Sequence, residues 1–237
     1  MPKLSSLNVE YQIKYSNKRK TIGISVDKKQ GLLVSAPQGT PIDEIETIIE
    51  SKNQWIHDKL DGFNNILSAP KSKEFVSGER LLYIGRSYRL QIKRTDTKKV
   101  DFKFHRGKFL ATIPDDGKNY SDKIRMKTIK WYRDKALEKI MTRIDYFKPK
   151  IGKTPKQVRI KQFKARWGTT QTDGSIDFNW MIIMAPMSII DFVVVHELCH
   201  LVAQSHSKVF WSKLSAIIID HEKRREWLRI NGATLIL

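Results

Sequence analysis

The stretch Ser188-Ile-Ile-Asp-Phe-Val-Val-Val-His-Glu-Leu-Cys-His-Leu-Val-Ala-Gln-Ser-His206 decides how this chain is interpreted. Its first two histidines are four residues apart, and such residues share a face only at the helical period of about 3.6 residues per turn. The pattern therefore predicts a helix, in spite of the valine-rich centre. Because the residues before His196 are apolar nearly all round, we expect this helix to be buried. Ser188, followed three positions later by Asp191, fits a capping box at its start.

On such a helix, His196 and His200 project together, one turn apart, as two ligands of a zinc ion do. Glu197 is adjacent to one ligand and can reach a metal-bound water. Zinc lowers the pKa of such a water from about 15.7 toward about 7. We therefore expect Glu197 to accept the proton of that water as the general base.

A third protein ligand is still required, and His206 is the best candidate. An ideal helix would carry His206 about 9 Å beyond His200, so the helix has to end and the chain has to turn back. Ser207 fits the N-cap of a following helix over Lys208–Ile218, which places His206 in the turn. Glu222, or another downstream acid, remains the alternative ligand. Three histidines leave one coordination position open, which is the catalytic arrangement.

Four further residues are weaker candidates. His221, Arg166 and Tyr132 could each stabilise an oxyanion, although each of these residue types is more often structural. Cys199 points away from the histidine face, and we interpret it as a small buried hydrophobic residue. It is the only cysteine, so no intrachain disulfide can form, and a reducing, cytoplasmic location is expected.

The chain carries a net charge of +19 over 237 residues, and the segment Lys123–Arg166 holds 16 Lys/Arg against 3 Asp/Glu. One interpretation is a surface that binds nucleic acid through its phosphates. The other is a set of solvated lysines on core helices, and charge alone does not separate the two. No apolar run approaches the roughly 20 residues needed to span a bilayer, so no membrane partner is expected. The oligomeric state is left open.

The pattern along the chain predicts an α+β fold. Alternating apolar and polar residues predict strands through much of residues 1–117, together with one helix from Pro41 to about Leu60. Pro114–Gly117 is the best linker candidate, and a long helix over Ile124–Phe147 follows it. We therefore expect a β-rich domain of residues 1–117 and a mainly helical metallopeptidase core of residues 118–237. No internal repeat is evident.

Two short strands, Gln157–Lys161 and Ser175–Phe178, precede the histidine motif, with a loop at Arg166-Trp-Gly168 between them. This loop opens the string Arg166-Trp-Gly-Thr-Thr-Gln-Thr-Asp-Gly-Ser-Ile-Asp-Phe-Asn-Trp180. Together with Val195-His-Glu-Leu-Cys-His-Leu201 and His206-Ser-Lys-Val-Phe-Trp211, the string resembles the YgjP-like metallopeptidase family. The likeness runs through nearly the whole chain.

The resemblance implies a zincin-like metallopeptidase core in which His196, His200 and His206 hold the metal and Glu197 is the catalytic base. It also implies distant kinship with SprT-like peptidases, which act on proteins bound to DNA. The family often has Ser-Cys where this chain has Thr169-Thr170. We therefore expect a zinc-dependent hydrolase that cleaves amide bonds in a peptide or protein. The alternative is a basic, nucleic-acid-associated protein, including a DNA-linked peptidase, whose metal site is accessory.

Overall fold

The structure, a computed structural model, describes residues 3–4, 9–27, 31–56 and 72–237. Contacts between residues divide the chain into two compact units, Met1–Ile66 and Leu67–Leu237. Strands dominate the N-terminal half and helices the C-terminal half, so the fold is α+β, as the sequence predicts. The division of the chain lies well before residue 117, where we expected the domain boundary.

In the part of the N-terminal unit that the structure describes, a sheet packs with a helix. These elements are β1 (Lys3–Leu4), β2 (Val9–Ser16), β3 (Gly23–Asp27), β4 (Gly31–Pro37) and α1 (Ile42–Ser51). The strand order is β1-β2-β4-β3, with β2 parallel to β4 and the other pairs antiparallel. Alternate side chains of β4 are buried and pack with Ile45 and Ile49 of α1. Residues 57–60 of the predicted helix lie outside the described residues.

The second unit begins with a sheet of β5 (Arg80–Tyr83), β6 (Arg86–Thr95), β7 (Asp101–His105) and β8 (Lys108–Pro114). Its order is β5-β6-β8-β7, with β6 parallel to β8 and the other pairs antiparallel. Turns at Ile84-Gly85 and at Arg106-Gly107 connect β5 to β6 and β7 to β8. Phe109, Ala111 and Ile113 of β8 alternate with more exposed residues, so one face of the sheet is buried.

The two sheets share one topology, which we did not recognise in the sequence. In each, the two central strands run parallel over six paired residues, from Tyr11↔Leu32 to Ser16↔Pro37 and from Leu90↔Phe109 to Thr95↔Pro114. Each sheet is followed in sequence by a helix. A repeat of this kind is hard to see in a single sequence, because burial on one face requires only apolar residues of compatible size.

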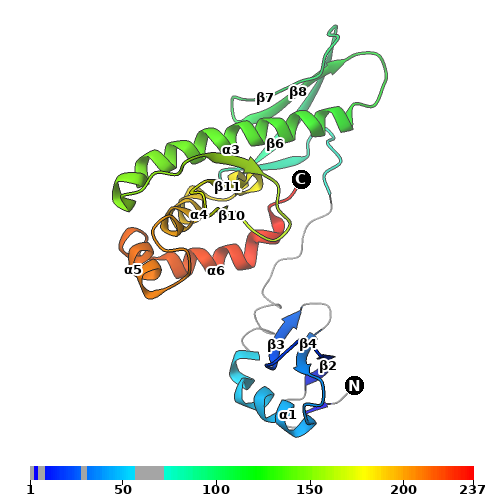
Figure 1. The fold of residues 1–237 in the computed structure, drawn as a ribbon. Helices are drawn as coiled ribbons and strands as arrows, with labels where there is room; N and C mark the ends of the chain where they lie inside the picture. Colours follow the sequence, from blue (N-terminus) through cyan, green and yellow to red (C-terminus); the bar gives the residue numbers. More distant parts are fainter. Residues whose placement is uncertain (1–2, 5–8, 28–30, 57–71) are drawn as a thin grey trace. The chain divides into compact units, whose positions relative to one another are not determined.

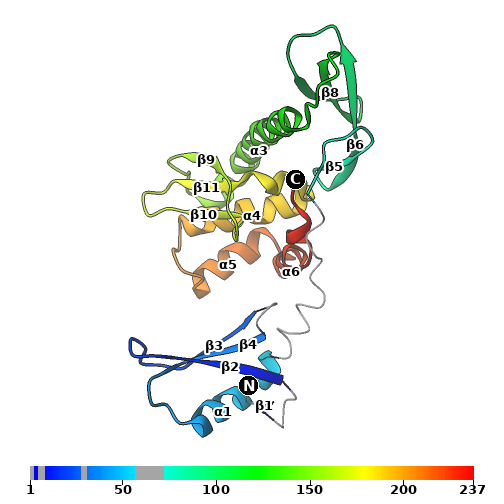
Figure 2. The ribbon, with the colours of Figure 1, turned by 90° about the vertical axis from the view of Figure 1, so that its right-hand side faces the viewer.

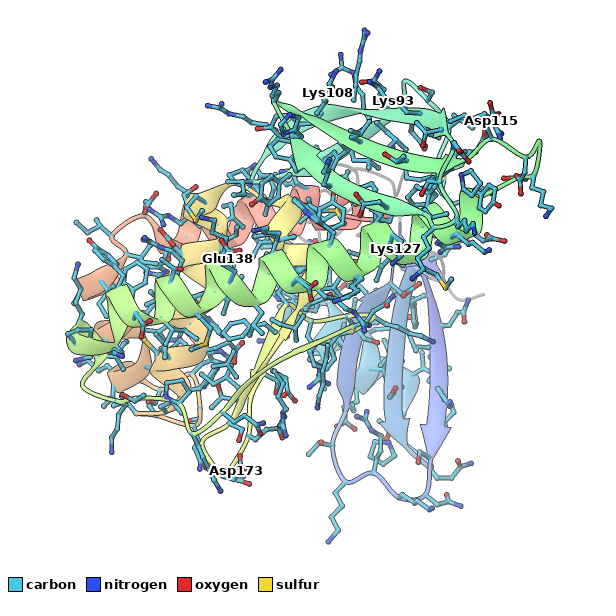
Figure 3. All side chains as sticks on the ribbon, turned by 90° about the horizontal axis from the view of Figure 1, so that it is seen from above. Lys93, Lys108, Asp115, Lys127, Glu138 and Asp173 are labelled. Carbon is cyan, nitrogen blue, oxygen red and sulfur yellow. The ribbon has the colours of Figure 1, made fainter. Side chains whose placement is uncertain are left out.

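The long helix α3 (Ser121–Ile151) explains why residue 117 does not separate two domains. Its buried residues follow one stripe at intervals of three or four, which is the helical period: Ile124, Thr128, Tyr132, Ala136, Ile140, Ile144, Phe147 and Ile151. Near its start, Trp131 packs against Phe102 and Phe109 of the sheet. Figure 3 shows α3 passing the sheet near Lys127 and extending away beyond Glu138. One helix thus joins the sheet to the C-terminal half of the chain.

The C-terminal half consists of a small sheet and a set of helices around α4 (Figures 1 and 2). The sheet contains β9 (Val158–Lys161), β10 (Gly168–Thr170) and β11 (Ile176–Asn179) in the order β10-β11-β9, so β10 is an edge strand. The remaining elements are η1 (Trp180–Met184), α4 (Met187–His200), α5 (Lys208–Ile217), α6 (His221–Asn231) and η2 (Gly232–Thr234). We had expected a loop up to Gly168, where β10 begins.

The helix α4 is buried nearly all round, as its apolar sequence predicts. The expected capping box is wrong, because the N-cap is Pro186 and no side chain caps the helix. Asp191 instead accepts two hydrogen bonds from Arg143 of α3, at 2.5 and 3.0 Å. A carboxylate engaged by a guanidinium in this bidentate way is not free to cap. None of the helices in the described part of the chain is both long and apolar enough to cross a membrane.

Candidate metal centre

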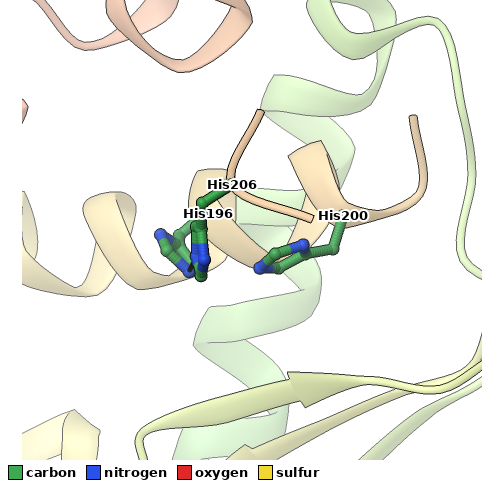
Figure 4. A group of neighbouring side chains, drawn as sticks. All are labelled: His196, His200 and His206. Atoms are coloured by element: carbon green, nitrogen blue, oxygen red, sulfur yellow. Dashed lines mark hydrogen bonds between the residues drawn. The ribbon is translucent and has the colours of Figure 1, made fainter. Parts of the chain in front are cut away.

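Three histidines converge at the C-terminal end of α4 (Figure 4). His196 and His200 project from the same face of the helix, and His206 returns to them from the connection to α5. Their potential ligand atoms all lie within 4.8 Å of one another, and no other such group of three occurs among the described residues. Glu222, the alternative ligand, is exposed and does not belong to this group.

The chain turns back after α4 in the manner that the sequence requires. The helix ends at His200, and the amides of Val202 and Ala203 still bond to the carbonyl of Cys199. The Ser207 side chain then accepts a hydrogen bond from the Phe210 amide and caps α5, as predicted. His206 therefore lies in the short connection between two helices, with both sides of the connection anchored.

Aromatic rings hold the three imidazoles together. The ring of Phe210 lies 5.0, 4.6 and 4.7 Å from the rings of His196, His200 and His206. Trp211 stacks on His206, with ring centroids 5.5 Å apart. Trp211 therefore contacts a predicted ligand directly. Rings with few rotatable bonds that are packed on several sides restrict the orientation of their neighbours.

The donor atoms fit a metal ion such as zinc. The Nε2 atoms of His196 and His206 are 3.2 Å apart, close to the roughly 3.4 Å that two Zn–N bonds of 2.1 Å span at a tetrahedral angle. Nδ1 of His200 lies 3.2 Å from the Ala203 carbonyl. Because a carbonyl only accepts, Nδ1 carries the hydrogen and Nε2 is left as the free donor atom, an arrangement typical of metal-bound histidines.

The electrostatics also suit metal binding. Burial lowers the pKa of His196 to about 3, helped by the neighbouring charges of His200 and His206. Burial likewise lowers the pKa of His200. An imidazole binds a metal only in its neutral form, so the protein holds both side chains in the state that a metal requires. Nδ1 of His196 is buried without a hydrogen-bond partner among the described residues.

Among the described residues that line this centre, Glu197 is the one acid, and it is 5% exposed. Burial raises its pKa to about 7, while a hydrogen bond from Thr170 and the charge of Arg166 act in the opposite direction. A pKa near neutrality suits a group that both accepts and releases a proton. The edge strand β10 passes so close that a Cβ added at Gly168 would lie 2.6 Å from Cγ of Glu197.

Thr170 and Gly168 are functional candidates that our sequence reasoning missed. The Thr170 hydroxyl lies 2.9 Å from Oε2 of Glu197 and 2.8 Å from its backbone carbonyl. The one signal in the sequence was the departure from the family pattern at Thr169-Thr170. Spacing could not identify the contact, because 27 residues separate Thr170 from Glu197.

A cleft of about 590 Å³ opens over the histidines and Glu197, and its opposite wall is formed by residues 168–172 of β10 and the following turn. Of the three oxyanion candidates, Arg166 lines this cleft. His221 instead contacts the Ser215 hydroxyl, and the Tyr132 hydroxyl donates to the Leu82 carbonyl in the core. Cys199 is fully buried and does not belong to the group of potential ligands, and burial raises the pKa of its thiol to about 11.

Comparisons with known proteins identify a family whose model matches most of the chain. A family described as "YgjP-like, metallopeptidase domain" matches residues 20–231. The chain is also similar to a solved structure of the metallopeptidase zymogen of Pyrococcus abyssi abylysin, at 21% sequence identity and a TM-score of 0.35. That similarity covers 39% of this chain and 92% of the other. No curated protein matches the sequence.

Proposed function

This chain belongs to the YgjP-like metallopeptidase family, and from that premise we propose that it is a zinc peptidase of the His-Glu-x-x-His type. The observation that carries the proposal is the convergence of three imidazoles beside one buried carboxylate at the floor of an open cleft. His196, His200 and His206 would hold the ion. Three neutral nitrogen ligands with a position left open are the donor set of catalytic rather than structural zinc.

Each residue of this centre then has a separate role in amide hydrolysis. A zinc ion in this centre would supply Lewis acidity, which acidifies water and polarises a carbonyl group. Glu197 takes the proton of the attacking water at its carboxylate and later delivers it to the leaving amine nitrogen. Thr170 holds that carboxylate in place through its hydroxyl. The edge strand β10 and Arg166 line the cleft in which the peptide lies.

The direct test replaces Glu197 by Gln, which keeps the shape of the side chain and removes the base. Hydrolysis of a fluorogenic peptide mixture by the zinc-loaded protein should fall by about 10²–10⁴-fold, while the zinc content stays the same. Glu222→Gln is the matched control, because Glu222 is exposed on α6 and lies outside the cleft. Equal turnover by the Glu197→Gln and wild-type proteins would refute the assignment of the base.

A second activity is supported by one observation, a concentration of lysines in unit Leu67–Leu237. A pocket of about 460 Å³ between the β6–β7 connection and the start of α3 is lined by Lys98, Lys99, Lys123, Lys127 and Lys130, with Val100, Tyr120 and Met126. Of these lysines, Lys130 pairs with Asp134. We propose that this pocket binds the phosphates of a nucleic acid, for which clustered lysines are the usual contacts.

Salt dependence tests this second proposal. A fluorescent DNA duplex should bind the wild-type protein with an affinity that falls steeply as salt increases, with a slope of about −0.9 per phosphate contact. Lys123→Glu/Lys127→Glu should weaken binding and flatten the slope. Lys18→Glu/Lys20→Glu makes the same charge change on the β2–β3 connection of the other unit and serves as the control. If both double variants lost the same amount of DNA affinity, net charge alone would explain the effect, and the assignment of the pocket would be overturned.

A further inference from the structure

A second cavity, of about 380 Å³, adjoins the metal cleft. The two cavities share four lining residues, Arg166, Gly168, His196 and Glu197. The second one extends from them toward α6. A group bound there would therefore lie beside the proposed general base, within the reach of a peptide whose scissile bond is at the metal.

The walls of the second cavity have two chemical characters. One part is apolar and aromatic, and it consists of Trp167, Phe192, Val193 and Leu228. The other part consists of three arginines, Arg166, Arg225 and Arg229. Glu197 is the single acidic side chain among the lining residues that the structure describes, and it is already engaged by Thr170. The described lining thus holds more basic than acidic side chains.

The three arginines differ in whether they form an ion pair with a carboxylate. Arg229 forms two short contacts with the Glu226 carboxylate, at 2.7 and 2.5 Å. In the described part of the chain, no ion pair joins Arg166 or Arg225 to a carboxylate. Arg229 is therefore paired within the protein, whereas Arg166 and Arg225 influence the Glu197 and Glu226 carboxylates without forming a close ion pair with them, which leaves their N–H donors available to a ligand.

Aromatic rings support the two unpaired guanidinium groups. Arg225 lies over the ring of Trp211 at 5.6 Å, and Arg166 lies over the ring of Phe163 at 5.7 Å. Stacking on a ring restrains the plane of a guanidinium but leaves its N–H donors directed outward. Trp211 also stacks on His206, so Arg225 is linked to the metal centre through a single ring.

We propose that Arg166 and Arg225 form a subsite for a carboxylate of the peptide substrate, next to the scissile bond. The inference rests on the proposed peptidase function and specifies its substrate class. A planar guanidinium matches a carboxylate with paired hydrogen bonds, and the apolar wall beside it strengthens the attraction by reducing local hydration. The carboxylate comes either from an Asp or Glu side chain or from the free C-terminus of a peptide, and the experiment separates these sources.

The first experiment compares peptides that differ only in this charge. One series places Glu or its isostere Gln at each of the three positions on either side of the scissile bond, and a second series compares a free C-terminus with its amide. At one of these positions, kcat/KM of the wild type should be about fivefold to tenfold higher for the peptide with the carboxylate than for its uncharged counterpart. Arg225→Gln should remove most of that preference, and Arg225→Glu should transfer it to a Lys-containing peptide. Lys223→Gln, an equal charge change at an exposed site of α6 outside the cavity, should preserve it.

The second experiment does not depend on turnover. Anisotropy of the labelled peptides is measured with the zinc-loaded Glu197→Gln protein, with and without Arg225→Gln. A preference for the acid that disappears with Arg225 supports the subsite, even where the wild type cleaves no peptide and the proposed function fails. Equal binding of acid and isostere at every position would overturn the subsite, and so would a preference that survives in Arg166→Gln/Arg225→Gln.

Discussion

The hydroxyl of Thr170 lies within hydrogen-bond distance of two oxygens of Glu197, 2.8 Å from the backbone carbonyl and 2.9 Å from Oε2. A hydroxyl carries one hydrogen and can accept others. It can therefore donate to the carboxylate when Glu197 is ionised. When Glu197 holds a proton, the hydroxyl can accept from the acid and donate to the carbonyl. The edge strand β10 thus restrains the base on α4 in both of its states.

Replacing Thr170 by Val, which has a similar volume but no hydroxyl, should therefore impair catalysis specifically. A hydrogen bond to a positioned base contributes about 1–1.5 kcal/mol, so kcat should fall by about tenfold with little change in KM or zinc content. Thr170→Ser should restore most of the activity, because it keeps the hydroxyl. Steady-state kinetics of the three proteins decide the matter, and a Ser variant as slow as the Val variant would point to packing instead.

A methyl group at Gly168 should disturb Glu197. The added Cβ would lie 2.6 Å from Cγ and 2.8 Å from Cδ of Glu197, which is shorter than any relaxed contact. Gly168→Ala should therefore destabilise the fold by about 1–3 kcal/mol and lower kcat. In a Glu197→Ala background the clashing atoms are absent, so the same substitution should cost much less. Denaturant unfolding of the four proteins in this cycle measures the difference, and equal costs in both backgrounds would contradict the contact.

Removal of a ligand should separate metal binding from folding. Wild-type protein should retain about one zinc per chain after dialysis, and zinc should raise its melting temperature because the metal binds only the folded state. His206→Ala should lose most of the metal and most of that thermal shift. His105→Ala, at an exposed position of β7, should behave as the wild type does. Elemental analysis and thermal scans provide the readout, and full zinc retention by His206→Ala would require another donor.

Acid should weaken the small sheet through Asp177. Burial alone would raise the pKa of this carboxyl, but hydrogen bonds from Lys161 and Arg159 outweigh it and lower the pKa. A carboxyl whose pKa is lower in the folded state stabilises the fold above the unfolded value of about 3.9. The contribution is lost as the pH falls through the folded value.

The Asp177→Asn variant tests this direction of the pH dependence. At pH 7 it should be about 1–2 kcal/mol less stable than the wild type, a figure that allows for solvent screening of the two half-exposed cations. The difference in stability between the variant and the wild type should become smaller below about pH 4. Asp115→Asn, an exposed control, should show no gap at either pH. A gap of unchanged size at pH 3 would mean that the ion pairs of Asp177 do not account for it.

Local patterns allowed a good part of this molecule to be predicted. The position of α4, the turn that returns His206 and the cap at Ser207 all follow from residues close together in sequence. The capping box failed because Arg143, which is 48 residues away, takes the Asp191 carboxylate. The boundary between the two units also differs from the expected residue 117. The reason is that α3 packs against both the β5–β8 sheet and the helices η1 and α4, and so joins them in one unit.

The amino-acid sequence by itself determined that two histidines and a glutamate share one buried helix, and that a third histidine follows in a turn. Those relationships depend on the helical period and on short-range capping, and both involve only residues that are close together in sequence. Only the tertiary structure decided what faces the centre: Thr170 and Gly168 on the carboxylate, Phe210 against the imidazoles, and two unpaired arginines beside them. Such contacts arise when separate elements pack, and the spacing along one chain does not specify them.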